Sequence, residues 1–529
     1  MKTTRPESML LPSRVRDVVG RMKVSLHQNI YEADFEYGTQ PMRWENYTVN
    51  TASSGSYANV VHVPGMGGVR MLVGNNAGDL TVRQSRPYMR YQPGKTMYMA
   101  TAMNFGLPTA NNFQRVGFFD DGNGVFFEQG LATANNPAGM YCVIRSDAGI
   151  VNFNDGTYTS SLPVDTKFSY ENWYGDPVGS LIDWTKIQML WIEYAWYGAG
   201  AIRWGCQING EPYVLHEVGT GNSSYRGTPQ QFPWSRTGNL PVRYEQRNIG
   251  PTTSNSALVH FGVSVVVEGR RDDQRGFTYA YGLPPGTNRR TVPSNSTRYP
   301  VVSVQMNQMG KVEFSGNSTS NNIVTASSNT TFLTVNGTPW TANQFVGRAI
   351  SFQGSGPTTN TFIGRIANNT SNTLYMNDII SNTSPVAGTP NSSYTYTIGL
   401  VNRGQILPQS LVVASDNAAI IELIVSTATN PVQLTNATFT PLNTLGSFNS
   451  LASRDYSANA ITANTGEVVY AFSAPAGGSG LQTFDLTNLF ALYNNIKGNA
   501  PDILTVAVST NSTSTANVSA HLIAQEAMS

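Results

Sequence analysis

Strand-length runs rich in Val, Ile, Thr, Tyr and Phe recur along almost the whole chain, and clusters of Gly, Pro, Asn and Asp separate them. This spacing is typical of β-sandwiches and jelly rolls. Helical periodicity is best at two short segments, 12–21 and 485–493. The sequence therefore predicts an all-β, multidomain fold of sandwich or jelly-roll type. The clearest predicted strands are 97–103, 187–194, 201–208, 263–268, 419–425 and 502–508.

Two glycine-containing segments predict tight turns. The segment 120–124, Asp-Asp-Gly-Asn-Gly, lies between two apolar runs, and Asn209-Gly210 follows the predicted strand 201–208. Gly and Asn tolerate the positive φ angles that two-residue hairpin turns require. We therefore expect a β-hairpin at 120–124 and a turn at Asn209-Gly210.

Shifts in composition divide the 529 residues into four predicted segments. Residues 1–54 form an N-terminal arm or anchor, and 55–310 form the main lectin-like or jelly-roll-like sandwich. Residues 311–398, dominated by Asn, Ser and Thr, form a small inserted β domain, and 399–529 form a C-terminal sandwich. A lone strand is not stable by itself, so the strand in the arm must pair with the main body or with another subunit.

The chain carries little charge. Charged residues make up 12% of the sequence, about half the usual share of roughly 25%. Removing water from such a surface on contact with a neighbour costs little free energy, which favours a protein docked in an assembly. The alternative is a secreted β-protein with a neutral surface. The net charge is +1 without a basic stripe, so no nucleic-acid partner is expected. No apolar run reaches membrane-spanning length, no long apolar stretch at the N-terminus suggests a signal peptide, and no cofactor is expected.

The two cysteines, Cys142 and Cys206, lie in apolar, strand-like stretches. Buried free thiols are expected there rather than a disulfide framework. The five histidines show neither HxH nor HExxH spacing, which argues against zinc. Neither a GxSxG elbow nor a Walker loop is present. The histidines are His27, His62, His216, His260 and His521.

Several carboxylates are candidates for catalytic or metal-binding groups. A sandwich glycosidase needs two carboxylates facing one groove, and Asp183 and Glu193 lie on or beside the most apolar strand. Sandwich glucanases carry carboxylates at alternate positions of one strand, whereas Trp191, Glu193 and Ala195 share that face here. We therefore predict no catalytic pair and assign Asp183 to a turn.

The carboxylates and amide around the predicted hairpin also fail the register of a calcium loop. The sequence therefore predicts a hairpin rather than a metal site at these positions, and no metal site elsewhere. The residues concerned are Asp120, Asp121, Asn123 and Glu128.

Aromatic residues cluster between positions 173 and 204. Their strand spacing favours a core role, but four of them lie near turns and are candidates for an exposed patch that stacks on sugars. These four are Trp173, Tyr174, Trp196 and Tyr197.

The segment 31–44, YEADFEYGTQPMRW, resembles a stretch near the N-termini of virion structural proteins of large tailed phages, which have relatives among large eukaryotic DNA viruses. The resemblance is good over about 30–300 and thinner over 400–529, and it brings no catalytic residue. It implies a capsid-surface, decoration, head-fibre or tail-fibre protein located in the virion. Further stretches of the same kind are 90–95, 115–127, 183–205, 240–245 and 403–408.

These observations predict a non-enzymatic structural component of a virus particle that acts by self-assembly. By analogy with such proteins we expect a homotrimer docked on major capsid or tail proteins. A tail-fibre-type receptor that binds host-surface glycan is the alternative, and a polysaccharide-degrading spike has less support. The residues expected to serve assembly and anchoring are Tyr31, Phe35, Tyr37, Pro41 and Trp44.

Overall fold

The described part of the chain is built from β-strands. The computed structural model describes residues 26–51, 58–147, 163–169, 182–197, 200–219, 233–253, 256–269, 276–284, 289–317, 323–325, 331–335, 337–354, 362–381, 394–427, 429–442, 450–475, 482–487, 489–498, 500–510 and 513–527. Within these ranges the sheets are antiparallel, and one short 3-10 turn, Pro64–Met66, is the sole helical element. The predicted all-β, sandwich-type fold is confirmed.

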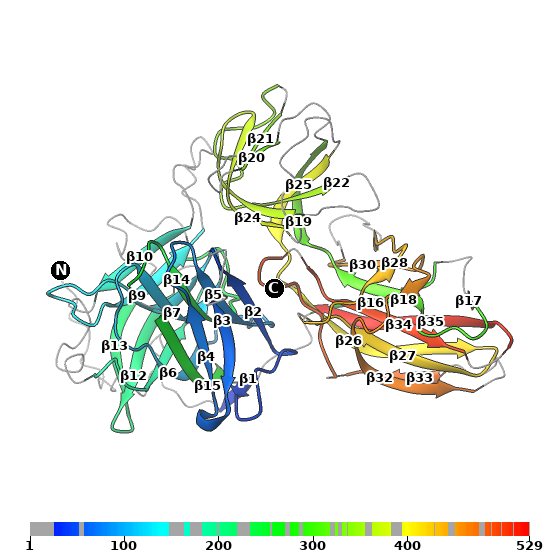
Figure 1. The fold of residues 1–529 in the computed structure, drawn as a ribbon, viewed down its shortest axis with the longest axis horizontal. Helices are drawn as coiled ribbons and strands as arrows, with labels where there is room; N and C mark the ends of the chain where they lie inside the picture. The colour runs from blue at the N-terminus through cyan, green and yellow to red at the C-terminus, as the bar shows by residue number, and fades with distance from the viewer. Residues whose placement is uncertain are drawn as a thin grey trace, which may run out of the picture. The chain divides into compact units, whose positions relative to one another are not determined.

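The chain divides into two compact units, Met1–Asp272 and Asp273–Ser529. The first unit is a sandwich of two sheets (Figure 1). The eight-stranded sheet, here called the front sheet, has the order β13 (Glu211–Gly219), β12 (Ala201–Ile208), β11 (Gln188–Tyr194), β6 (Met97–Asn104), β15 (Ser256–Glu268), β4 (Gly68–Val73) and β3 (Asn59–Val63), with β1 (His27–Asp34) also beside β15. The back sheet has the order β10 (Val164–Ser169), β9 (Met140–Ser146), β8 (Gly124–Gln129), β7 (Asn112–Phe119), β14 (Val242–Asn248), β5 (Leu80–Ser85) and β2 (Trp44–Val49).

The core of the first unit forms where the inward faces of the two sheets meet. Side chains alternate between the faces of a strand, and β6 shows this as buried methionines separated by half-buried residues. Cys142 from the back sheet and Cys206 from the front sheet both point into this core as free thiols. The prediction of buried free cysteines is confirmed. Burial raises the pKa of Cys206 to about 12.

Both predicted turns are present. Strands β7 and β8 pair as a hairpin, and a side-chain oxygen of Asp120 accepts the backbone N–H groups of Gly122 and Asn123. Asn209 and Gly210 have φ angles of 53° and 84°. Positive φ at two successive residues is the signature of a type I′ turn, and here it connects β12 to β13.

Strands β1 and β2, from the predicted arm, pair with strands of the same unit. β1 lies beside β15 and β2 beside β5, and Tyr31, Phe35 and Trp44 are buried in the core. The guanidinium of Arg83 lies 4.9 Å from both the Phe35 and Trp44 rings. Of the two pairings left open by the sequence, the arm strand adopts the one with the main body.

Two of the predicted anchor residues remain at the surface. The side chain of Tyr37 is 89% exposed, and Pro41 is also exposed. The anchoring role of all five residues stays a prediction.

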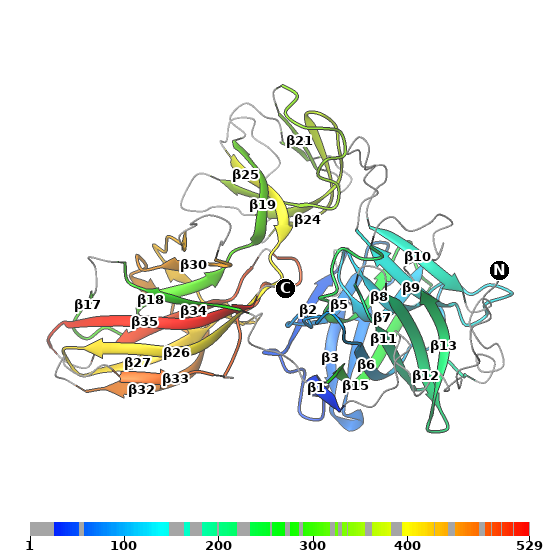
Figure 2. The same ribbon diagram turned by 180° about the vertical axis from the view of Figure 1, so that it is seen from behind.

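The second unit contains a further sandwich and a separate sheet (Figure 2). One sandwich sheet has the order β16 (Phe277–Gly282), β35 (Ala516–Ala527), β26 (Gln405–Ser415) and β33 (Gln482–Asp485), with β17 (Arg290–Val292) also beside β35. The other has the order β29 (Thr440–Pro441), β30 (Ala452–Asp455), β18 (Tyr299–Met306), β34 (Ile503–Ser509), β27 (Ala419–Val425) and β32 (Glu467–Ala474). They share one apolar core, and a two-stranded pair joins β28 (Leu434–Thr435) to β31 (Ala460–Ile461).

The separate sheet falls in the stretch predicted as an insert. It has the order β19 (Met309–Asn317), β25 (Tyr394–Val401), β22 (Ala349–Gly354), β23 (Phe362–Asn369), β24 (Thr373–Ser381), β21 (Thr331–Thr334) and β20 (Ile323–Thr325). A core of its own lies on it, around Trp340 and Phe345. The limits assigned to the four segments stay a prediction.

The expected helix at 485–493 is wrong. In its described residues this segment is the end of β33 followed by turns and an isolated bridge to Ile406. The Leu489 N–H donates to the Leu486 carbonyl as in a turn, but the Leu486 N–H donates to the Gln409 carbonyl and Leu492 exchanges two bonds with Ile406, both on β26. Burial of Leu486 and Leu492 in the core stabilises this arrangement. The other expected helix, 12–21, lies outside the described residues.

Replacing Phe35 by Ala tests how firmly the arm strands belong to the first unit. Removing a fully buried Phe side chain costs about 3–5 kcal/mol, so we expect a clearly lower free energy of unfolding. Urea titration followed by tryptophan fluorescence measures it, because every tryptophan except Trp340 lies in the first unit. Tyr37→Ala is the control and should change stability by no more than about 0.5 kcal/mol. Equal effects of both changes would contradict the burial described here.

Candidate functional site

A pocket of about 320 Å³ opens on the outward face of the front sheet. Every residue that lines it belongs to the first unit, on or next to strands β1, β6, β11, β12, β13 and β15. Its size is at the lower end of the range of roughly 300–1,000 Å³ for small-molecule sites. The lining residues are His27, Thr96, Tyr98, Trp191, Glu193, Arg203, Pro212, Val214, Val266 and Glu268.

Strand register brings these side chains together. In β11, Glu193 lies opposite Tyr98 of β6 on one side and Arg203 of β12 on the other. Tyr98 in turn lies opposite Val266 of β15. Directly paired residues of adjacent strands share a face of the sheet, so this row runs across the floor of the pocket.

Trp191 forms the apolar part of the floor. It precedes Glu193 by two residues and therefore shares its face, while its ring stacks with that of Tyr98 at a centroid distance of 5.9 Å and an angle of 26°. On the other side its indole lies over Gly205, where a Cβ would come within 2.1 Å of the ring. Trp191 is only 5% exposed although it lies outside the sandwich core. Gly205 thus makes the space that lets the indole lie flat.

Charged groups surround this aromatic floor. The Arg203 Nε donates to a Glu217 carboxylate oxygen at 2.7 Å, and its Nη1 lies 3.6 Å from a Glu193 carboxylate oxygen. At the opposite wall, the Thr96 hydroxyl donates to Glu268 at 2.7 Å. Burial, and then the negative charge of Glu193, raise the pKa of Tyr98 to about 12. The pocket therefore offers carboxylate acceptors, guanidinium donors and a protonated phenol beside two ring faces.

Only one of the two carboxylates weighed from the sequence lies in the pocket. Asp183 is in a turn, where one carboxylate oxygen accepts both the backbone N–H and the hydroxyl of Thr185, as predicted. Glu193 lines the pocket together with Glu268, which comes from a different strand. Two carboxylates on different strands cannot be found by comparing positions along one strand. Glu193 and Glu268 come together because β6 pairs with β11 on one side and with β15 on the other.

The predicted aromatic patch is split. Trp173 and Tyr174 lie outside the described residues. Trp196 is half-buried, and its indole N–H donates to the Ser235 carbonyl at 2.9 Å. Tyr197 is 56% exposed. The buried role expected of the other aromatics holds for Trp184, Tyr194 and Trp204 in the sandwich core, and also for Trp191, which is buried on the outward face of the front sheet.

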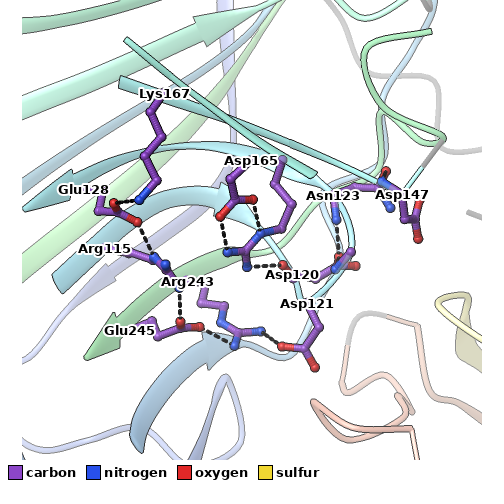
Figure 3. A network of polar contacts seen from close by, with 12 residues as sticks. Arg115, Asp120, Asp121, Asn123, Glu128, Asp147, Asp165, Lys167, Arg243 and Glu245 are labelled. Carbon is purple, nitrogen blue, oxygen red and sulfur yellow. Dashed lines mark hydrogen bonds and ion pairs between the residues drawn. The ribbon is translucent and has the colours of Figure 1, made fainter. Parts of the chain in front are cut away.

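A second charged cluster lies on the back sheet (Figure 3). In the ion pairs given below, four guanidinium or ammonium groups contact four carboxylates. The described charges neutralise one another within hydrogen-bond distance. The cluster therefore links strands β7, β8, β9, β10 and β14 of the back sheet. Its contacts are Arg115–Glu128 at 2.7 Å, Arg115–Glu245 at 2.6 Å, Lys167–Glu128 at 2.5 Å, Arg243–Glu245 at 2.5 Å, Arg243–Asp121 at 2.8 Å and Arg145–Asp165 at 2.8 Å.

Glu245 is the centre of this cluster. Burial alone would raise its pKa, but Arg243 and Arg115 outweigh that effect and lower the pKa to about 2. Its neighbours include the residues weighed as calcium ligands. Of these, Glu128 is bound to Arg115 and Lys167, while Asp120 and Asn123 belong to the hairpin.

Buried histidines belong to the core. His260 stacks on Tyr244 with centroids 3.9 Å apart, and burial lowers the pKa of His216 to about 4. In the part of the chain that the structure describes, no cluster of three or more His, Cys, Asp or Glu side chains is arranged to hold a metal ion. None of the helices there has the length and hydropathy of a transmembrane span.

Comparison with known proteins gives matches to solved structures alone, since neither a family model nor a curated protein matches. A glycosyl hydrolase family 16 protein from Mycobacterium smegmatis is 12% identical over 45% of this chain and 100% of its own, with a TM-score of 0.28. A Bacillus licheniformis β-glucanase is 11% identical over 47% and 98%, with a TM-score of 0.25. The Crh5 transglycosylase in complex with NAG is 14% identical over 46% and 84%, with a TM-score of 0.26. Values this low assign no activity to this chain.

The prediction that the chain is not an enzyme is contradicted by these matches, because the matched proteins are hydrolases and a transglycosylase by name. We withdraw that prediction. Carboxylates of a single strand are not the sole candidates for a catalytic pair, because Glu193 and Glu268 reach the same pocket from β11 and β15.

Replacing Glu245 by Gln tests the back-sheet cluster. The folded-state pKa of Glu245 is depressed from 4.5 to about 2, so its contribution is present above about pH 4.5 and is lost as the pH falls towards 2. Removing one partner of a buried ion pair costs about 3–5 kcal/mol. We expect the variant to be less stable at neutral pH and to lose less stability on acidification. Urea unfolding at neutral and acidic pH measures both, and the exposed Glu36→Gln change is the control. Parallel pH profiles of wild type and Glu245→Gln would refute this assignment.

Proposed function

We propose that the first unit binds carbohydrate in the pocket of the front sheet. The observation that carries this proposal is the stacked pair of Tyr98 and Trp191 in a pocket edged by carboxylates and a guanidinium. Binding sites for small molecules combine apolar and aromatic walls with a few placed polar groups. This pocket has that composition.

The chemistry of the lining fits a ligand rich in hydroxyl groups. The carboxylate oxygens of Glu193 and Glu268 accept hydrogen bonds, and the Arg203 guanidinium donates only. A sugar hydroxyl does both, so one sugar unit can form hydrogen bonds with groups of each kind. The apolar face of its ring can lie against the half-buried Tyr98, which stacks on Trp191. The two carboxylates also disfavour a sugar that carries its own negative charge at this position.

Tyr98→Ala tests carbohydrate binding. The wild-type chain should bind neutral glycans on an array, and the variant should bind them at least about tenfold more weakly, because the loss of one stacked ring is worth about 0.5–1.5 kcal/mol and its hydroxyl is lost as well. Glu193→Gln, which keeps the shape of the side chain, should also weaken binding. Tyr456→Ala, in the second unit, is the matched control. Absence of glycan binding by the wild type, or an undiminished signal from Tyr98→Ala, would count against the proposal.

A second candidate function is assembly into a virus particle, as the sequence resemblance implies. The observation that favours it is β32, which ends its sheet order and pairs with β27. Val468 and Tyr470 on this strand are 39% and 37% exposed. An edge strand with exposed apolar side chains and little charge can pair with another chain. We propose that such contacts build a homotrimer.

Val468→Lys tests assembly through β32. A lysine on an edge strand opposes pairing with another strand, so we expect the variant to be monomeric where the wild type is trimeric in light-scattering measurements. Leu107→Lys, at an exposed position of the first unit, should leave the trimer intact. Immunogold labelling of purified particles then locates the wild-type chain. A monomeric wild type that is absent from particles would exclude this function.

A further inference from the structure

The pocket of the front sheet is lined by more acidic than basic groups. Among the ten described residues that line it, Glu193 and Glu268 bring carboxylates and Arg203 brings a guanidinium. His27 adds positive charge only when its imidazole is protonated. Arg203 also donates to Glu217, a carboxylate outside the lining, at 2.7 Å. Two carboxylates therefore share the charge of one guanidinium, and the lining of the pocket is negative.

The two lining carboxylates lie on either side of Tyr98. Glu193 of β11 is directly opposite Tyr98 in the pairing of β11 with β6. On the other side β15 places Val266 opposite Tyr98, and Glu268 lies two residues further along the same face. The Thr96 hydroxyl donates to the Glu268 carboxylate at 2.7 Å, and the Glu268 N–H donates to the Thr96 carbonyl at 3.2 Å. Strand pairing thus fixes an aromatic ring between two acidic groups.

Burial strengthens the effect of these acidic groups on a ligand. Glu193 is 2% exposed and Glu268 is half-buried, so salt and water screen their charges less than those of an open surface. Burial, and then the negative charge of Glu193, raise the pKa of Tyr98. Carboxylates attract a cation, and so does an aromatic ring face within about 6 Å of it. The pocket therefore suits a positively charged group better than a neutral one.

We propose that the sugar bound in this pocket carries a positively charged amine, so that the ligand class is an amino sugar with a free amino group. This inference rests on the proposed carbohydrate binding. A protonated amine has three N–H donors and no acceptor, which matches the acceptor oxygens of Glu193 and Glu268. Hydrogen bonds between charged partners are about twice as strong as neutral ones. The ring of the sugar lies against Tyr98, and its amine lies at the wall that contains Glu268.

The guanidinium of Arg203 favours an amino sugar over a simple amine. Lysine side chains and other protonated alkylamines carry donors and no acceptor, so they offer no hydrogen bond to Arg203. Hydroxyl groups of a sugar accept from a guanidinium and donate to a carboxylate. A hexose with one amino group therefore has charged donors for the acidic side of the pocket and acceptors for Arg203.

Calorimetric titration of the full chain with matched sugars tests this proposal. Glucosamine, N-acetylglucosamine and glucose share one ring and differ at a single position, which holds an amine, a neutral amide or a hydroxyl. At about pH 7 most of the amine is protonated, and we expect the wild type to bind glucosamine about tenfold more tightly than either neutral sugar. Salt at about 0.5 M should reduce this preference. Ethanolamine, an amine without a sugar ring, should bind about tenfold more weakly than glucosamine.

A charge-removing variant then locates the amine. Glu268→Gln keeps the shape of the side chain and removes its charge, so the preference for glucosamine should fall to about twofold or less, while the affinity for glucose changes much less. Glu36→Gln removes a charge at an exposed position of the same unit. It is the matched control and should keep the tenfold preference.

The outcomes separate this inference from the proposed carbohydrate binding. Equal affinity of the wild type for the three sugars, or a preference that survives in Glu268→Gln, would overturn the amino-sugar assignment while Tyr98-dependent glycan binding stands. Neutral glycans bound on the array without binding of glucosamine would have the same meaning. Ethanolamine bound as tightly as glucosamine would mean that the sugar ring contributes nothing, and would overturn both proposals. So would failure to bind any of the three sugars together with a blank glycan array.

Discussion

The register with which β11 pairs with β6 and β12 fixes both the core and the pocket of the first unit. With this register, Leu190, Ile192 and Tyr194 enter the core, while Trp191 and Glu193 face outward into the pocket. A slip of one residue would exchange the two sets. It would bury a carboxylate and expose three large apolar side chains. Stability of the sandwich and composition of the pocket are therefore two results of one constraint.

The first unit buries charge as well as apolar surface, in two different ways. On the back sheet, carboxylates and guanidiniums compensate one another around Glu245 (Figure 3). Arg83 is instead buried between the Phe35 and Trp44 rings and donates to the Thr39 carbonyl and Asn46. Burial lowers the pKa of Arg83 to about 10. Because a buried ion pair adds little net stability but is costly to break, both arrangements specify which strands lie together.

The sequence predicts local features of this fold better than long-range ones. Strands 201–208 and 419–425 match the structure residue for residue, and the Asn209-Gly210 turn follows from local chemistry alone. The segment 485–493 fails because bonds to Ile406 and Gln409, remote in sequence, decide its conformation. The sequence does not predict the pocket for the same reason, since the carboxylates that line it come from separate strands. Trp191 is buried as expected, but the sequence pattern does not show on which side of the sheet it lies.

The two thiols in the core bear on the conditions in which this unit can fold. Cys142 and Cys206 come from opposite sheets and are both free, and burial raises the pKa of each. The thiolate is the form that reacts with oxidants and disulfides, and it is scarce at such sites. The native first unit thus depends on no covalent bond between its described sheets and shields its thiols from oxidants. A change between reducing and oxidising surroundings would leave its covalent structure as it is.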